Sequence, residues 1–223
     1  IQNDVLFYSV VYDMSNYTSV RAVLADNLTI EARDSVINII DYGCGQGVAT
    51  LATLEHIASQ KDPKTTHLNI HLIEPSSVSL GNASYKVLCL AQAYGFSTTI
   101  TSQNCLLANA IVPNFNKGAD TLHLMSYILD VPAVQQQLQA ITNQIRQLSG
   151  VQHIIASDIA YPTGFNGLNL LSRQLLGYAT YIERYNETYQ CYDVIQGGFT
   201  SRTSKAIGFM LSLNNDSAFH QVA

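Results

Sequence analysis

The stretch VINIIDYGCGQGVATLATLEHIASQ, from Val36 to Gln60, joins an apolar run, three alternating glycines and a segment with helical spacing. The β-branched residues before the glycines predict a short buried strand, and the apolar spacing after them predicts a helix. Glycine allows positive φ and lets a ligand approach the backbone, while the first turn of a helix offers unpaired N–H groups. The stretch therefore predicts a small-molecule site at the end of a strand; the alternative is a tight turn without a ligand.

The alternation of strand and helix continues along the chain. Apolar spacing and the placement of glycine and proline predict helices over 76–95 and 132–150, and further parallel strands over 67–75, 96–104, 119–127 and 151–159.

The last third of the chain has a different rhythm. A helical pattern over 168–189 precedes two strand-like runs, 190–196 and 204–213, which 197–203 joins as a hairpin connection. We therefore expect an α/β fold whose seven-stranded, mostly parallel sheet ends in an antiparallel strand and carries helices on both faces.

The composition predicts one globular domain over 1–223, because 223 residues suffice for a single full core. Hydrophobic residues make up 47% of the chain and charged residues only 12%, against about 25% in typical proteins. The formal net charge is −5 and the 11 Lys and Arg residues are scattered, which argues against bulk nucleic-acid binding.

The compartment is predicted from the absence of export and membrane signals. No apolar run approaches the ~20 residues that span a bilayer, and the first residues lack the pattern of a signal peptide. The four cysteines show no CxxC spacing, so we expect reduced thiols in a cytoplasmic protein with no membrane partner. The chain starts at Ile1 rather than Met, so we expect it to begin inside a longer protein.

The spacing of the glycines argues against two phosphate-binding motifs. The dinucleotide fingerprint would need a third glycine at Val48, and no lysine follows the glycines as a phosphate-binding loop requires. DYGCGQG, from Asp41 to Gly47, instead resembles the first motif of the class I S-adenosylmethionine-dependent methyltransferases, D/E-x-G-x-G-x-G. This resemblance implies the Rossmann-like class I methyltransferase sandwich, S-adenosylmethionine as cofactor and S-adenosylhomocysteine as product. It also implies cofactor contacts for the motif, namely Asp41, Gly43, Cys44, Gly45 and Gly47.

The resemblance extends over about 36–159, although only the first motif and Glu74 are specific. In the family, an acidic residue after the second strand accepts hydrogen bonds from both ribose hydroxyls, and Glu74 matches it. A carboxylate fits two converging O–H donors because it is an acceptor with two oxygens. The alternative for Glu74 is a solvated charge. By looser resemblance, Asn104, with Gln103 as the alternative, is placed near the adenine, and Ser126 and Tyr127 are placed near the methionine end.

Tyrosines are the candidates for an aromatic wall around the sulfonium, since the chain has 13 Tyr and no Trp. One group lies in the segment 1–35, which we expect to form an N-terminal helical cap with Tyr17 near the cofactor. The second group recurs every three or four residues from Tyr178 to Tyr192, and we interpret the segment 164–190, which holds most of it, as a helical insertion over the acceptor pocket. Simple packing is the more common role for such a stripe. The two groups are Tyr8, Tyr12 and Tyr17, and Tyr178, Tyr181, Tyr185, Tyr189 and Tyr192.

Candidate acid–base residues follow the fifth predicted strand. Asp158 and Tyr161 lie at the carboxyl edge of the sheet, where open α/β sheets bind ligands. For Asp158, helix capping or simple solvation is the alternative. His123 is expected to be a hydrogen-bonded core histidine. His67 and His71 share one strand face but lack a third ligand, so we expect no metal.

Methyl transfer is an in-line displacement, so the protein mainly aligns the acceptor and excludes water. The acidic chain favours a small-molecule acceptor. The motifs of the amino-methylating N/D-P-P-Y/F enzymes and of the cytosine C5 enzymes are absent from the sequence. The alternatives are an RNA or protein acceptor, or a catalytically silent methyltransferase-like scaffold. A homodimer through the Tyr-rich segment is a candidate assembly.

Overall fold

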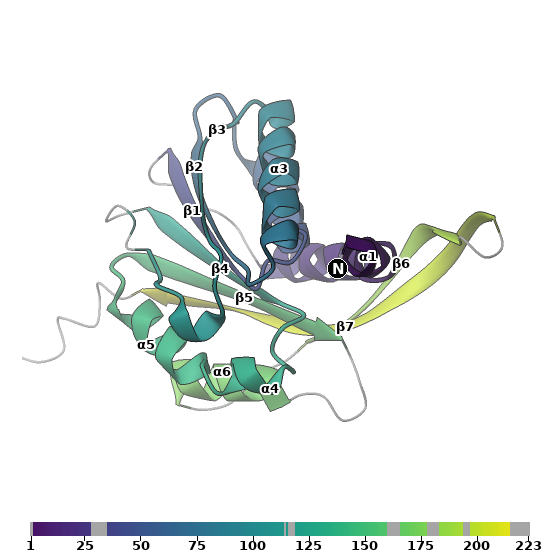
Figure 1. Ribbon diagram of the computed structural model, residues 1–223. Helices are drawn as coiled ribbons and strands as arrows, with labels where there is room; N and C mark the ends of the chain where they lie inside the picture. Colours follow the sequence, from purple (N-terminus) through teal and green to yellow (C-terminus); the bar gives the residue numbers. More distant parts are fainter. Residues whose placement is uncertain are drawn as a thin grey trace, which may run out of the picture.

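The computed structural model describes residues 2–27, 35–113, 115, 119–159, 166–177, 183–193 and 197–214. These residues form one seven-stranded sheet with the strand order β3-β2-β1-β4-β5-β7-β6 (Figure 1). The strands are β1 (Val36–Tyr42), β2 (His67–Ile73), β3 (Ser97–Gln103), β4 (Asp120–Ser126), β5 (Val151–Ile159), β6 (Glu183–Asp193) and β7 (Gly198–Asn214).

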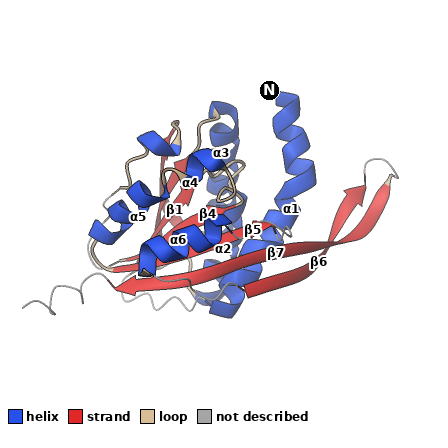
Figure 2. Ribbon diagram, turned by 90° about the horizontal axis from the view of Figure 1, so that it is seen from below, coloured by secondary structure: helices blue, strands red, loops and turns tan. Residues whose placement is uncertain are grey.

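Helices cover both faces of this sheet (Figures 1 and 2). One layer holds α1 (Gln2–Asn27), α2 (Val48–Gln60) and α3 (Ser77–Tyr94), which share an apolar core with β1, β2 and β4. The other layer holds α4 (Pro132–Gln135), α5 (Leu138–Gln147) and α6 (Asn166–Leu176), whose side chains form a second core. A short 3-10 helix, η1 (Leu107–Asn109), follows β3.

The pairing of the strands confirms the predicted sheet. β1 to β5 are parallel, with Asp41 of β1 opposite Leu72 of β2 and Leu124 of β4. β7 pairs antiparallel with both β5 and β6, so the sheet ends as expected in antiparallel strands. Because β1 and its two neighbours are parallel, their carboxyl ends meet at one edge of the sheet.

The last third of the chain corrects two of the predicted boundaries. The predicted helix over 168–189 ends at Leu176 in α6, and the helical prediction is wrong from 183 onward because those residues form β6. The predicted hairpin connection at 197–203 is also wrong. Residues Gly198 to Thr203 belong to β7 and pair with β6, from Gly198 opposite Asp193 to Thr203 opposite Thr188.

Smaller differences concern the helices. The single helix predicted over 132–150 is divided into α4 and α5. The N-terminal helical segment forms α1 over Gln2–Asn27, which packs on α2 and on β5, β6 and β7. No described helix is long and apolar enough to cross a membrane.

Buried polar side chains link the central strands. His123 of β4 lies 3.0 Å from the Tyr42 hydroxyl through Nδ1 and 2.9 Å from Gln152 Oε1 through Nε2. Burial lowers the pKa of His123 to about 4, so the ring is neutral. The prediction of a hydrogen-bonded core histidine is confirmed, and no group of potential metal ligands is found in the described part of the chain.

Candidate functional site

The glycine loop between β1 and α2 requires its three glycines. Gly43, Gly45 and Gly47 have φ values of 63°, 51° and 78°, in the left-handed region that side chains disfavour. A Cβ on Gly43 would also lie 3.0 Å from a methyl carbon of Ile128. The loop is anchored to β2 by the Cys44 N–H, which donates to the Ile73 carbonyl at 3.0 Å. The backbone of the loop therefore passes the ends of β1 and β2 with no side chain at these three positions.

Glu74 faces this loop from the end of β2. One carboxylate oxygen accepts the Gly45 N–H at 3.1 Å, and the other accepts the Ser76 N–H at 3.0 Å. Each carboxylate oxygen has two lone-pair sites, so both oxygens keep acceptor capacity for a ligand. Glu74 is therefore held in place by the backbone while it can still bind a pair of hydroxyl groups.

A cavity of about 310 Å³ opens beside Glu74 and Gly43. This volume lies at the lower end of the range of small-molecule sites. Its walls come from the loop after β3 and from the segment between β4 and α5, and they are mostly apolar: Leu106, Leu107, Ala108, Ile128, Val131, Ala133 and Val134. None of these residues is predicted from the sequence, because apolar side chains in loops and short helices carry no motif. The cavity suits a flat apolar ring with a polar group at the Glu74 end.

A second, smaller cavity of about 40 Å³ lies on the other side of Gly43 and Ile128. The predicted residues Asp41, Cys44, Gly45, Ser126 and Tyr127 line it together with residues of α1. This volume is enough for ordered water but is far below the roughly 300 Å³ at the lower end of small-molecule sites. The structure thus brings the predicted methionine-end residues together around a space that α1 nearly closes.

The closure consists of hydrogen bonds between α1 and the end of β4. Ser126 donates its hydroxyl to Asn16 Oδ1 and lies 2.8 Å from Ser157 Oγ. The Tyr127 hydroxyl lies 3.1 Å from Ser15 Oγ and 3.0 Å from Ser19 Oγ. Asp13 and Asn16 of α1 reach the cavity, whereas the residues predicted from this segment are the tyrosines Tyr8, Tyr12 and Tyr17.

Asp41 is buried beneath the small cavity. Burial raises the pKa of its carboxyl group from the ordinary value of 3.8 to about 7, and the charge of Glu74 adds to the rise. The Thr50 hydroxyl donates to Asp41 Oδ2 at 2.7 Å and partly offsets the effect on the pKa. Burial likewise raises the pKa of the Cys44 thiol, so Cys44 is neutral. A positive charge in the small cavity would stabilise the Asp41 carboxylate.

Tyr127 adopts a strained backbone conformation directly after β4. Its φ is 60°, and it is the one non-glycine residue with positive φ in the described part of the chain. Its N–H donates to the Ser157 carbonyl at 2.9 Å, which holds the residue in place. Strain of this kind tends to persist at functional sites, where the surroundings fix it.

The remaining predicted residues lie elsewhere or outside the described residues. Asn104 does not line either cavity; its amide donates to the carbonyl oxygens of Glu74 and Pro75, both at 3.0 Å, and ties the loop after β3 to that after β2.

Tyr17 packs under the Arg21 guanidinium, 5.8 Å from the ring centre, rather than in either cavity. Asp158 is buried on β5 opposite Ile207 of β7 and lines neither cavity. Tyr161 lies outside the described residues.

The tyrosines predicted to form a helical stripe lie partly on β6 and partly outside the described residues. Tyr185, Tyr189 and Tyr192 lie on β6 rather than on a helix, so they do not form a helical wall. Tyr178 and Tyr181 lie outside the described residues.

Comparison with known proteins identifies the fold. No protein-family model and no curated protein matches the sequence. Precorrin-8w decarboxylase from Methanobacterium thermoautotrophicum is 17% identical, with a TM-score of 0.53 over 86% of this chain and 88% of its own. Precorrin-6y C5,15-methyltransferase from Geobacter metallireducens is 13% identical, with a TM-score of 0.49 over 85% and 87% of the two chains. The chain has the Rossmann-like fold of the class I methyltransferases.

Proposed function

We propose that the protein binds S-adenosylmethionine and transfers its methyl group to a small-molecule acceptor. The observation that carries the proposal is the meeting of three features at the carboxyl ends of β1, β2 and β4: the left-handed glycine loop, Glu74, and a cavity of about 310 Å³. Open α/β sheets bind their ligands at this edge.

The residues around the two cavities fit this cofactor. The apolar cavity offers space for the adenine ring, and Glu74 can accept hydrogen bonds from the ribose hydroxyls while the backbone holds it. When bound, the cofactor supplies a methyl group that is activated by the positive charge of a sulfonium. Asp13 and Asp41 line the smaller cavity, where a cationic methionine end would be attracted by Asp13 and would favour the charged form of Asp41.

The small cavity must widen for this fit, because about 40 Å³ does not hold an amino-acid side chain with its backbone. Asn16, Ser15 and Ser19 of α1 lie closest to the residues that would have to separate. The movement of α1 would therefore admit the methionine end and then exclude water from it.

Charge favours a small acceptor over RNA. Neither cavity is lined by Lys or Arg, and the acidic residues Asp13, Asp41 and Glu74 line them. Lys86 approaches from outside the lining, with Nζ 3.8 Å from Asp13, and offsets part of this charge. A phosphate backbone near these groups would be repelled, since nucleic-acid sites are built from clustered cations. Together with the net charge of −5, this supports a neutral or cationic small molecule.

Calorimetry with S-adenosylmethionine and S-adenosylhomocysteine tests the cofactor. We expect both compounds to bind the wild-type protein and neither to bind Gly45→Val, whose fold is checked by circular dichroism. Absence of binding at millimolar concentration would refute the proposal.

A second measurement tests the acceptor. Native mass spectrometry identifies small molecules that co-purify with the protein, and each is then assayed for formation of S-adenosylhomocysteine. Methylation of transfer RNA but of no small molecule would refute the small-molecule acceptor. Cofactor binding without any methylated product would favour the scaffold alternative.

A further inference from the structure

The two edges of the sheet differ in how they are protected. β6, at one edge, carries four charged residues: Glu183, Arg184, Glu187 and Asp193. β3, at the other edge, reads STTITSQ and has neither charge nor proline. Natural proteins usually block exposed edge strands with charges, prolines or bulges, because unpaired backbone groups invite another strand. The edge of β3 lacks these devices.

The backbone of β3 presents alternate residues to the open side. The Gln103 carbonyl accepts the Glu74 N–H at 3.1 Å, so Gln103 faces β2. In a strand, the N–H and C=O groups of one residue point the same way, and the direction alternates along the chain. Thr98, Ile100 and Ser102 therefore direct their backbone groups away from β2, toward the free edge.

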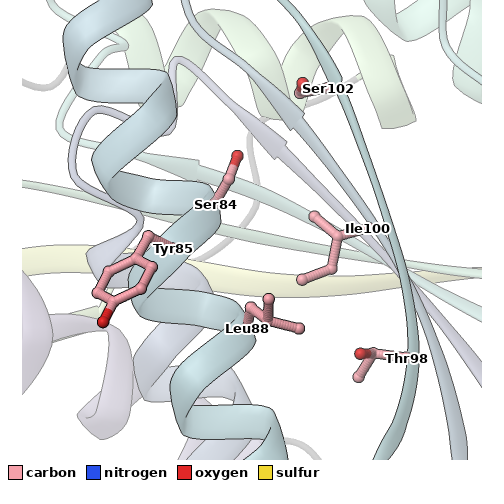
Figure 3. A pocket seen from close by; sticks show the side chains of 6 residues that line it. All are labelled: Ser84, Tyr85, Leu88, Thr98, Ile100 and Ser102. Atoms are coloured by element: carbon pink, nitrogen blue, oxygen red, sulfur yellow. The ribbon is translucent and has the colours of Figure 1, made fainter.

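The side chains of the same three residues form one wall of a groove. A cavity of about 490 Å³ lies between β3 and α3 and is lined by Thr98, Ile100 and Ser102 on one side. Figure 3 shows Leu88 of α3 and Ile100 of β3 pointing toward one another, while Tyr85 projects from the helix. Tyr85 is 70% exposed and Leu88 is 39% exposed. The groove is open, uncharged and partly apolar.

Exposed apolar residues gather on this helix. Of the nine large hydrophobic residues that are exposed in the described part of the chain, four lie on α3: Val78, Tyr85, Leu88 and Tyr94. Concentrated exposure of this kind marks interaction surfaces more often than scattered single residues do.

We propose that β3 pairs antiparallel with β3 of a second copy of this chain, across a two-fold axis at Ile100. Such pairing sets Ile100 opposite its symmetry mate and Thr98 opposite Ser102, with the outward backbone groups of all three residues exchanging hydrogen bonds. On the other face, Thr99 lies opposite Thr101. Every cross-strand pair then joins uncharged, mostly β-branched residues, which pair favourably.

A second copy explains the groove as well as the edge. Both α3 helices would lie on the same face of the joined sheets, so the two grooves would merge and the exposed side chains of Tyr85 and Leu88 would be covered. β3 can pair with a second copy of itself, because its seven residues are centred on residue 100 and carry no charge that would select a different partner. These features favour a symmetric dimer over an unrelated peptide.

Sedimentation velocity over a series of protein concentrations tests the dimer. We expect a reversible monomer–dimer equilibrium in the wild-type protein. A protein that stays monomeric at high micromolar concentration would overturn the proposal and leave the edge to another partner.

Paired substitutions test the register. Thr98→Lys with Ser102→Lys places like charges opposite one another, and we expect the dimer dissociation constant to rise by at least about tenfold. Thr98→Glu with Ser102→Lys places opposite charges at the same positions, and we expect the dimer to persist. Equal dimerisation of the Lys–Lys variant and the wild type, or equal loss in both double variants, would overturn the proposed pairing.

Two further variants guard against indirect effects. Tyr85→Lys changes an exposed side chain on α3 and should weaken the dimer without altering the thermal unfolding of the monomer. Phe199→Lys, at a 79% exposed position on β7, should leave the dimer unchanged. A dimer that responds to Phe199→Lys but not to Tyr85→Lys would use another surface and would contradict the proposal.

Discussion

The Glu74 carboxylate accepts a hydrogen bond from the Gly45 N–H at 3.1 Å, which ties the end of β2 to the loop after β1. A single residue therefore shapes the glycine loop and borders the 310 Å³ cavity. The position of Glu74 is fixed before a ligand arrives, because the Ser76 N–H holds its other oxygen. Such preorganisation reduces the free-energy cost of binding.

Glu74→Ala should weaken the binding of S-adenosylhomocysteine by about 1–3 kcal/mol, because charge-assisted hydrogen bonds are lost. Glu74→Gln should have a smaller effect, since its amide oxygen can still accept the Gly45 N–H. Titration calorimetry measures both. Glu55→Gln is the control, because Glu55 lies on α2 beside Arg21 and away from both cavities. An affinity unchanged in Glu74→Ala would refute the role assigned to Glu74.

Asp41→Asn should alter the pH dependence of stability. The pKa of Asp41 is higher in the folded protein, about 7, than its ordinary value of 3.8, so the folded state favours the protonated carboxyl group. The stabilising contribution of the protonated Asp41 is thus lost as the pH rises from about 4 to about 7, which lowers the free energy of unfolding by up to about 4 kcal/mol. The stability of Asp41→Asn relative to wild type should increase over this range, as urea unfolding at pH 4 and pH 8 would measure.

The comparison of the two proteins isolates Asp41 from other titrating groups. His123 has its pKa lowered to about 4, so its contribution changes in the opposite direction with pH, but it is present in both proteins. A stability difference between wild type and Asp41→Asn that does not change with pH would contradict a raised pKa for Asp41.

The sequence predicts the central part of the fold well because β1 to β5 have strong local signals. Val36–Tyr42 is rich in β-branched residues, is buried and is followed by glycine, so the strand and the loop can be predicted without knowledge of their tertiary contacts. The signal is ambiguous at 183–193, where Tyr185, Tyr189 and Tyr192 fit helical spacing. Tyr185, Tyr189 and Cys191 also fit the spacing of two that a strand shows, although Glu187 interrupts the series. Pairing with β7, which the sequence does not reveal, decides between the two.

The site could be predicted only where a motif marks it. Asp41 lies near the end of β1 and Glu74 directly follows β2, and the structure places both at the cavities. Asp13 and Asn16 reach the small cavity from a helix that is distant in sequence, and such contacts depend on how α1 packs. The aromatic ring of Tyr17 predicts a place in the wall around the sulfonium, but α1 places this ring beside Arg21.

Asn16→Ala should speed the binding of S-adenosylhomocysteine if α1 must separate from β4 to admit it. The substitution removes the acceptor for the Ser126 hydroxyl, which keeps Ser157 as a partner. Loss of one hydrogen bond that holds the closed state, worth about 0.5–1.5 kcal/mol, corresponds to an association rate constant about 2- to 10-fold higher. Stopped-flow fluorescence measures the rate. Met14→Ala, at an exposed position on α1, is the control, and equal rates in Asn16→Ala and wild type would exclude this opening of α1.

Gly47→Ala should destabilise the protein more than Gly45→Ala does. Both residues have positive φ, so an alanine at either position costs about 1–2 kcal/mol in backbone strain. A Cβ on Gly47 would also lie 3.1 Å from the Ala83 Cβ and 3.3 Å from its Cα, where α2 approaches α3, whereas a Cβ on Gly45 meets no atom within 4 Å. Urea unfolding measures the two losses. Because the Gly45 position has open space, Gly45→Ala tests the backbone strain alone, and a loss equal to that of Gly47→Ala would show that the contact with α3 carries no cost.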